Sequence, residues 1–315
     1  MTAAAYAAPA TSRRTAWRWT QIALAAGTLG VLVWHVGTGP FVDGVRALDA
    51  GALAAASGIA VVTTGLCAWR WRVVAGGLGA ELPLRTAVAG YYRSLFLNVA
   101  LPGGVLGDVH RGISHGRDTR DVGRGLRAVA WERSAGQAVQ LVLTVAVLLA
   151  LPSPLRSATP LAAAALLVAA VAVAFAARGR APGGPSRRAR WRAAAGRELR
   201  DGLLARWPAV ALASALVVAG HTATFLIAAR SAGVTEPLSE LVPLALIVLA
   251  GAALPNIGGW GPREGVTAWA FAAAGLGASL GVATAVVYGV MVLFASLPGA
   301  AVLVADTVHR GAVRA

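Results

Sequence analysis

LPGGVLGDVHRG, at residues 101–112, and LPNIGGWGPREG, at residues 254–265, are the two stretches that decide the fold of this chain. Each combines a proline and several glycines with an arginine and an acidic residue, inside sequence otherwise apolar enough to lie in lipid. Helix-breaking backbone and charged side chains are costly at membrane depth unless protein or trapped water surrounds them. The two stretches therefore predict breaks buried in protein, and they are the best candidates for a functional site.

The composition is that of a polytopic membrane protein. Of the 315 residues, 57% are hydrophobic and 13% are charged, whereas a soluble domain has about 25% charged residues. The basic residues are all arginine and give a net charge of +15. They lie between apolar runs and form no basic face with interleaved aromatics, which argues against nucleic acid as a partner. Cys67 is the one cysteine, so an intrachain disulfide or a CxxC metal cluster is excluded.

Apolar runs predict the spanning helices. A hydrocarbon core of about 30 Å takes roughly 20 residues to cross. Six runs are long enough, at residues 20–37, 51–69, 127–150, 159–177, 209–229 and 280–305. Two more apolar regions, residues 86–106 and 240–278, contain the Pro-Gly breaks.

Arginine placement decides whether the two broken regions cross. If both dip in and return, most arginines fall on one side, in loops that include residues 69–86 and 107–127. By the positive-inside rule that side is cytoplasmic, and both termini lie there. We therefore expect an all-α polytopic protein of the cell membrane, with about six spanning helices and two re-entrant hairpins.

The order of these elements predicts an inverted repeat within a single membrane domain, residues 1–315. Residues 17–150 and 158–306 each have the order helix, helix, hairpin, helix, the first half starting from inside and the second from outside. Such repeats place substrate near the midplane, where broken helices of the two halves face each other. The Arg-rich residues 178–208 join the halves as a cytoplasmic linker, which either binds anionic lipids or is a solvated basic loop.

The first broken region offers an anion site. Asn98 precedes the break, which Pro102 and Gly103 help to form. Backbone amides freed at the start of the next helix attract anions, helped by the helix dipole. Asp108 and Arg111 are three residues apart on that helix. Either they serve a phosphate headgroup, or they pair with each other at the cytoplasmic surface.

The second broken region contains Asn256 and Gly259, followed by Arg263 and Glu264 at the start of an apolar helix. Apolar sequence flanks these charges on both sides, which favours a buried role. Adjacent helical residues diverge, so a mutual pair between Arg263 and Glu264 is expected to be poor. We therefore expect each of them to have a partner elsewhere.

The expected partners are Glu132 and Arg133, about one turn into the apolar run that follows the first break. Arg133, Gln137 and Gln140 recur at helical spacing and predict a polar stripe that faces the bundle. The alternative is a buried ion-pair network that orients helices without touching substrate.

Two further polar residues lie in apolar helices. Tyr288, with Thr284 and Met291 on the last helix, occupies the place in the second half that is equivalent to this polar stripe, and packing is the alternative to ligand binding. His221 is interpreted as a satisfied core histidine rather than a proton relay.

These motifs together resemble the lysylphosphatidylglycerol synthase transmembrane region, also called the flippase-like domain family. LFLNVALPGGVLGDVHRG, RAVAWERSAG and LPNIGGWGPREG, with a tyrosine on the last helix, carry the resemblance over nearly the whole chain. Gly289 departs from the family pattern, in which arginine often follows the tyrosine. The residues that match the family's motifs are Asn98, Pro102, Gly103, Gly107, Asp108, Arg111, Glu132, Arg133, Gly258, Gly259, Gly261, Arg263, Glu264 and Tyr288.

The resemblance implies the movement of aminoacylated phospholipid across the bilayer, and, because the chain ends at Ala315, not the synthase reaction. We expect a lipid translocase for an anionic phosphate-headgroup lipid, either an aminoacyl phospholipid or a polyprenyl-phosphate carrier. Its phosphate would be held by arginines balanced by carboxylates, namely Arg111, Arg133 and Arg263 with Asp108, Glu132 and Glu264.

No cofactor or metal is expected for this activity. The sequence lacks GxxxxGK[ST] and HExxH, so transport would be passive or ion-coupled. Two alternatives remain open. One is a membrane enzyme that acts on lipid phosphate or sugar, and the other is a scaffold that recruits lipid or glycan biosynthetic enzymes through the linker.

Overall fold

The computed structural model describes residues 33–101, 104–151, 203–252 and 260–312, with a few isolated residues between 27 and 200. Every element of this described part is a helix. Before the first long helix lies α2 (Gly39–Arg46), which packs on α12. The predicted all-α class therefore holds for the described residues.

Four stretches of helix are long and apolar enough to cross a membrane. They are α3 (Ala50–Gly77), α6 (Val122–Ala150), η3 with α9 (Leu204–Arg206 and Trp207–Ser231), and α12 with most of α13 (Ala278–Ser296 and Pro298–Ala312). They coincide with four of the six runs predicted to span. The other two, residues 20–37 and 159–177, lie largely outside the described residues, as does most of the linker at 178–208.

Each Pro-Gly stretch separates two short helices. The first pair is α4 (Leu84–Ala100) and α5 (Leu106–Asp118), and the second is α10 (Leu238–Gly251) and α11 (Pro262–Ala273). The two helices of each pair pack against each other. Left-handed glycines stand beside both breaks, Gly104 at φ 62° and Gly261 at φ 111°, a conformation that side chains other than glycine rarely adopt.

One segment predicted as a cytoplasmic loop is helical instead, because α3 continues to Gly77 through the segment predicted to begin a loop at residue 69. The short helix predicted to follow the first break is present as α5, which contains residues 107–118 of the segment predicted as cytoplasmic. The loop interpretation treated each arginine as a topological signal. In the structure Arg70 and Arg111 are buried, at 5% and 1% exposure, because both are paired inside the bundle.

Local signals in the sequence explain where several helices begin. The Asp49 carboxylate accepts a 2.8 Å hydrogen bond from the amide of Ala52, and Asp121 caps the amide of Arg124 at 2.8 Å. Helix α11 begins with Pro262, whose missing N–H costs nothing at the first helical position. These caps satisfy amides that have no partner within their own helix.

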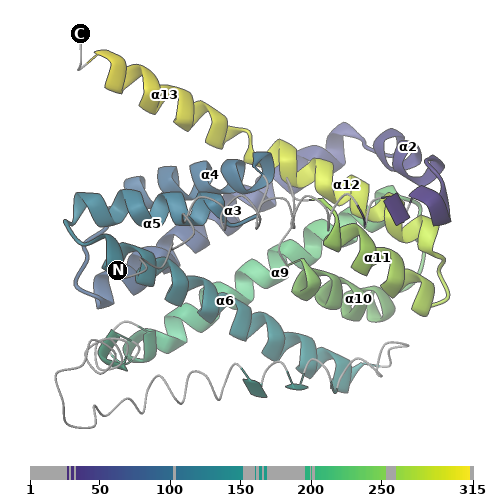
Figure 1. Cartoon of the computed structure of the whole chain (residues 1–315). Coiled ribbons are helices and arrows are strands. Elements are labelled where there is room, and N and C mark those ends of the chain that lie inside the picture. Colours follow the sequence, from purple (N-terminus) through teal and green to yellow (C-terminus); the bar gives the residue numbers. More distant parts are fainter. Residues whose placement is uncertain are drawn as a thin grey trace, which may run out of the picture.

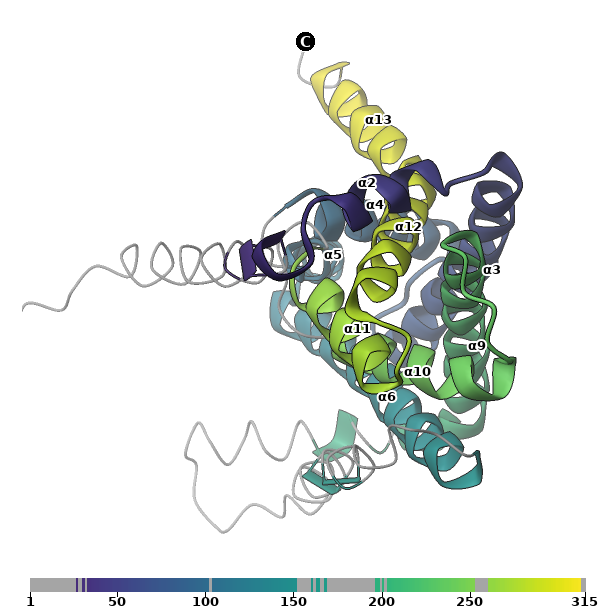
Figure 2. The same ribbon diagram turned by 90° about the vertical axis from the view of Figure 1, so that its right-hand side faces the viewer.

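The two sets of helices turn at opposite ends of the bundle (Figure 1). Helices α3 and α4, and likewise α5 and α6, are joined at one end, whereas α9 and α10, and α11 and α12, are joined at the other. Helices α3 and α9 pack side by side along one side of the bundle, and α13 projects away from it (Figure 2). The helix pairs α4–α5 and α10–α11 thus extend into the bundle from opposite ends.

Two main hydrophobic clusters hold these helices together. One is built chiefly on α9 to α12 and contains Phe225, Phe271 and Met291, all at most 1% exposed. The other is built chiefly on α3, α4 and α6 and contains Trp71 and Val74. Polar and charged side chains gather between and beside these clusters.

Gly107 marks the closest approach of α4 and α5, and it supports a prediction. A Cβ atom added at Gly107 would lie 2.1 Å from the carbonyl oxygen of Ser94. We therefore expect Gly107→Ala to force the two helices apart and to cost about 1–3 kcal/mol. Thermal unfolding in detergent measures this. Gly58→Ala is the control, because nothing lies within 4 Å of its added Cβ atom; equal melting temperatures for both variants would contradict the prediction.

Candidate functional site

Glu132 is the centre of a buried ion-pair network. It lies in the first half of α6 and is fully buried. Its Oε1 accepts hydrogen bonds from Arg70, including one of 2.9 Å from Nε, and its Oε2 accepts one of 2.7 Å from Arg111. The hydroxyl of Tyr91 lies 3.4 Å from Oε1. One carboxylate therefore joins α3, α4, α5 and α6.

Asp108 is the second acceptor of the network. Its Oδ1 accepts from Arg111 Nε at 2.9 Å and from Ser94 Oγ at 3.1 Å. Its Oδ2 accepts from Asn98 Nδ2 at 2.9 Å and from Arg133. Donors from α4, α5 and α6 thus converge on a carboxylate that is 5% exposed. This arrangement ties the first break to the helix that carries Glu132.

One amide in the first turn of α5 already has a partner within the protein. The amide of Gly107, at its start, donates a 2.8 Å hydrogen bond to Asn98 Oδ1. The side-chain oxygen of Asn98 therefore accepts from the helix start, and its side-chain nitrogen donates to Asp108. An anion at this helix start would therefore compete with the Asn98 side chain for the Gly107 amide, and the predicted anion site stays a prediction.

Arg111 is buried among aromatic rings. Its Cζ lies 4.7 Å from the ring centroid of Trp71 and 4.3 Å from that of Tyr91, which is the range of a cation–π contact. The alternative that Arg111 and Asp108 pair with each other is confirmed, but the pair lies inside the protein and not at its surface. His115, one turn further on, packs edge-on to Trp71 at 5.6 Å, and burial lowers its pKa.

The network holds an excess of positive charge. Three arginines, Arg70, Arg111 and Arg133, share the two carboxylates of Asp108 and Glu132. Four of these side chains are 0–6% exposed, whereas that of Arg133 is 40% exposed. Within this network, the guanidinium of Arg133 is therefore the positively charged group that remains accessible.

The second broken region has its own ion pair. Arg263 Nε and one of its terminal nitrogens donate to Glu264 Oε1 at 3.0 and 2.5 Å. Glu264 Oε2 accepts from the amide of Gly261 at 2.6 Å. The expectation that neighbours in sequence would not pair, and that Glu132 and Arg133 would be their partners, is wrong. Within the first turn of α11 the Glu264 side chain folds back over the helix start, which brings it to the guanidinium.

Aromatic rings flank Arg263 as they flank Arg111. Its Cζ lies 5.5 Å from the ring centroids of both Trp260 and Tyr288. Gly289 makes room for it, since a Cβ atom there would lie 2.4 Å from a nitrogen of Arg263. The departure from the family pattern at Gly289 therefore coincides with the seat of this guanidinium.

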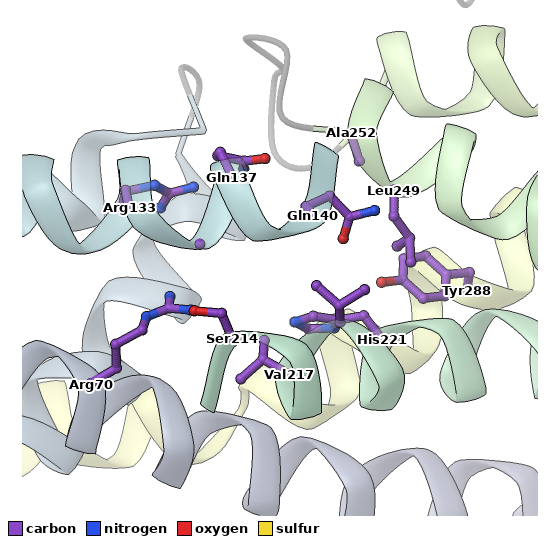
Figure 3. A pocket seen from close by; sticks show the side chains of 12 residues that line it. Arg70, Arg133, Gln137, Gln140, Ser214, Val217, His221, Leu249, Ala252 and Tyr288 are labelled. Carbon is purple, nitrogen blue, oxygen red and sulfur yellow. The ribbon is translucent and has the colours of Figure 1, made fainter. Parts of the chain in front are cut away.

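A polar cavity of about 230 Å³ lies between α3, α6, α9, α10 and α12 (Figure 3). Its polar lining comprises Arg70, Arg133, Gln137, Gln140, Ser214, His221 and Tyr288. Several of these residues, among them Gln137, His221 and Tyr288, lie near mid-length of their helices. Of the described residues that line the cavity, two are arginines and none is acidic.

The polar stripe predicted on α6 faces the interior of the bundle, where it forms one wall of the cavity. Arg133, Gln137 and Gln140 all line it. Gln140 Nε2 donates to the carbonyl oxygen of Leu246 at 3.1 Å, in the chain's second broken region. Tyr288 also borders the cavity while its ring packs on Phe225, at a centroid distance of 5.8 Å. It therefore combines packing with access to whatever fills the space.

His221 does not behave as a satisfied core histidine. It lies at the middle of α9, is exposed to the cavity, and lines a smaller apolar cavity as well. Across the described residues no hydrogen bond to its ring is found. The interpretation from sequence rested on the apolar helix around it, and a helix sequence does not reveal a cavity formed with other helices.

Sequence reasoning missed Arg70 and Ser214. Arg70 donates to Ser214 Oγ at 2.9 Å, which links the network across to α9. A signal for Arg70 existed, because it shares a helical face with Cys67 and Val74, both buried, whereas Arg72 two residues later is exposed. Three predicted site residues, Gly103, Asn256 and Gly259, lie outside the described residues.

These features define a multi-pass helical membrane protein with a charged network and a polar cavity inside the bundle. The chain belongs to the family of the lysylphosphatidylglycerol synthase TM region, whose model matches residues 18–299. No curated protein and no solved structure matches it. Membership of this family links the chain to lipid modification or translocation in the membrane.

Proposed function

We propose that this protein translocates a lipid with an anionic phosphate headgroup between the leaflets. The observation that carries the proposal is the polar cavity lined by Arg70 and Arg133, between helices that are long and apolar enough to cross a membrane. A headgroup must pass the hydrocarbon core to change leaflets. Inside the hydrocarbon core, the polar side chains that line the cavity would replace the hydrogen bonds to water that the headgroup loses.

Electrostatics favour an anion in this cavity. Arg133 leaves part of its guanidinium accessible, and the network around it has one more cation than carboxylates. An uncompensated cation inside a membrane protein is costly. A phosphate diester carries one negative charge and would balance this excess, which a neutral lipid cannot do.

The residues divide into two roles under this proposal. Arg133, Gln137, His221 and Tyr288 border the cavity and would contact the headgroup. Arg111, Asp108 and Glu132 are buried in the network and would position Arg133 rather than touch lipid. Arg263 and Glu264 would do the same for Tyr288, whose ring Arg263 contacts.

The predicted inverted repeat gives the proposal a mechanism. Helices α3 to α6 have the same order as helices α9 to α12. Their contacts correspond as well. Helix α5 packs on α6 as α11 packs on α12, and α6 packs on α9 as α12 packs on α3. The helix pairs α4–α5 and α10–α11 extend into the bundle from opposite ends (Figure 1). Alternate movement of the two broken helix pairs would open the cavity first to one leaflet and then to the other.

A transport assay in liposomes tests the proposal. Fluorescent phosphatidylglycerol in both leaflets is bleached from outside, and translocation exposes the inner pool to the reagent. We expect Arg133→Gln to slow this roughly ten- to a hundredfold, because a charge-assisted hydrogen bond contributes about 1.5–3 kcal/mol. Arg124→Gln is the matched control, since Arg124 lies on the same helix with a side chain 39% exposed against 40% for Arg133.

The outcomes separate the alternatives. Equal rates for the two variants would contradict a role for the cavity. A change in the chemical identity of the lipid, at constant protein, would indicate a membrane enzyme. Protein-dependent transport at an equal rate of a fluorescent glycosyl diacylglycerol, which has no phosphate and crosses a bare bilayer slowly, would refute selection for phosphate. Normal lipid distribution, with function lost when the linker at 178–208 is neutralised, would indicate a scaffold.

A further inference from the structure

An apolar groove runs along the side of α9 that faces α6 and α10. It has a volume of about 390 Å³, and every residue that lines it is apolar except Thr222. Its floor includes Ala215, Ala219 and Ala223, four residues apart on one face of α9. Larger side chains from α6 and α10, including Leu143 and Leu246, form its walls. The small residues keep the floor open between these walls.

The groove adjoins the polar cavity. Val218 on α9 lines both spaces. On α6 the lining changes from Gln140, in the cavity, to Leu143 and Val147, in the groove, within two turns of helix. A polar space and an apolar one thus meet at Val218, between helices that are long and apolar enough to span the membrane.

We propose that this groove binds a hydrocarbon chain of the same lipid whose phosphate headgroup occupies the polar cavity. The proposal rests on the proposed function and extends it, because it gives the hydrocarbon chain of the transported lipid a binding site of its own. The boundary at Val218 separates polar from apolar lining just as a lipid separates headgroup from chain. The lipid would enter sideways from the bilayer, past α6 and α9, with its chain kept in an apolar environment throughout.

The length of the groove suits one chain. Its lining on α9 extends from Ala215 to Leu226. Eleven steps of 1.5 Å make about 16 Å, which is about half of a 30 Å hydrocarbon core. The groove therefore offers the apolar path of a single leaflet, beside a headgroup position near the midplane.

Photolabelling of the reconstituted full chain tests this site. The probe is phosphatidylglycerol with a diazirine in its acyl chain, and mass spectrometry locates the labelled residues. We expect labels on the groove residues of α6, α9 and α10, and at least a fivefold loss of them in Ala219→Trp, which fills the floor. Ala55→Trp is the control, an exposed alanine on α3 that lines neither space.

A second probe separates cargo from bulk lipid. Diacylglycerol with the same diazirine chain lacks the phosphate, and we expect it to label the groove several-fold less than phosphatidylglycerol does. Equal labelling by both probes, or equal labelling of the exposed residues Val61 and Val62 on α3, would overturn the proposal. Absence of any groove label, with a disulfide formed between cysteines placed at residues 219 and 168, would show that residues 159–177 cover the groove instead.

Failure of this proposal is distinct from failure of the proposed function. If Ala219→Trp transports phosphatidylglycerol at the unmodified rate, the groove is not the chain site but translocation stands. If the groove is labelled selectively by the phosphate probe while no transport occurs, lipid binding stands and translocation does not.

Discussion

Glu132→Gln is expected to cause the largest loss of stability of any single change in the network. The carboxylate is fully buried and accepts hydrogen bonds from both Arg70 and Arg111. Glutamine removes the negative charge and turns one acceptor oxygen into a donor facing a guanidinium. Breaking a buried pair in this way costs about 3–5 kcal/mol. Unfolding in detergent, followed by tryptophan fluorescence, measures the loss.

The same substitution at Glu198 provides the control. Glu198 pairs with Arg127 at 2.7 Å, but the two side chains are 13% and 27% exposed, so Glu198→Gln is expected to cost no more than about 1 kcal/mol. The double variant Glu132→Gln with Arg70→Met removes one of the stranded cations. It should be less destabilised than the sum of its single changes. Strict additivity would show that the charges of Arg70 and Glu132 are not coupled.

Hydropathy and helix-breaking residues were enough to predict the outline of the fold. Long apolar runs identified α3, α6, α9 and α12, and the Pro-Gly stretches identified both breaks. Helical spacing also predicted correctly that Arg133 and Gln140 face the interior. These features are local, since chain length, side-chain polarity and the residues that interrupt a helix determine them.

The contacts of the charged residues were not predictable in the same way. Arg70 was counted as a loop residue, although in the structure it pairs with Glu132, 62 positions away in the sequence. Arg263 was assigned a distant partner, although it pairs with the adjacent Glu264. Which carboxylate an arginine meets depends on helix packing and on side-chain conformation, and a single sequence specifies neither. Sequence reasoning therefore located the charges of the network except Arg70, and of their partners it anticipated only the pair of Asp108 and Arg111.

Asp108→Asn is expected to separate lipid binding from lipid transport. Asp108 accepts from Arg111, Arg133, Ser94 and Asn98, and it holds α4, α5 and α6 together at the first break. Asparagine leaves one oxygen for these donors and withdraws the counter-charge of Arg133. The guanidinium of Arg133, no longer paired with Asp108, would then be free to bind an anion in the cavity that Arg133 lines. We therefore expect phosphatidylglycerol to bind several-fold more tightly and to be transported roughly tenfold more slowly, because charge-assisted bonds of about 1.5–3 kcal/mol are lost at the break.

Binding is measured with fluorescent phosphatidylglycerol in detergent, and transport with the liposome assay. Asp121→Asn is the matched control, because Asp121 caps the next helix with a side chain 38% exposed, and asparagine caps a helix about as well as aspartate. A parallel loss of binding and transport in Asp108→Asn would mean that Asp108 supports only the fold. A split between them would mean that the carboxylate restrains Arg133, and that the ion pair is part of how the cavity releases the lipid it has bound.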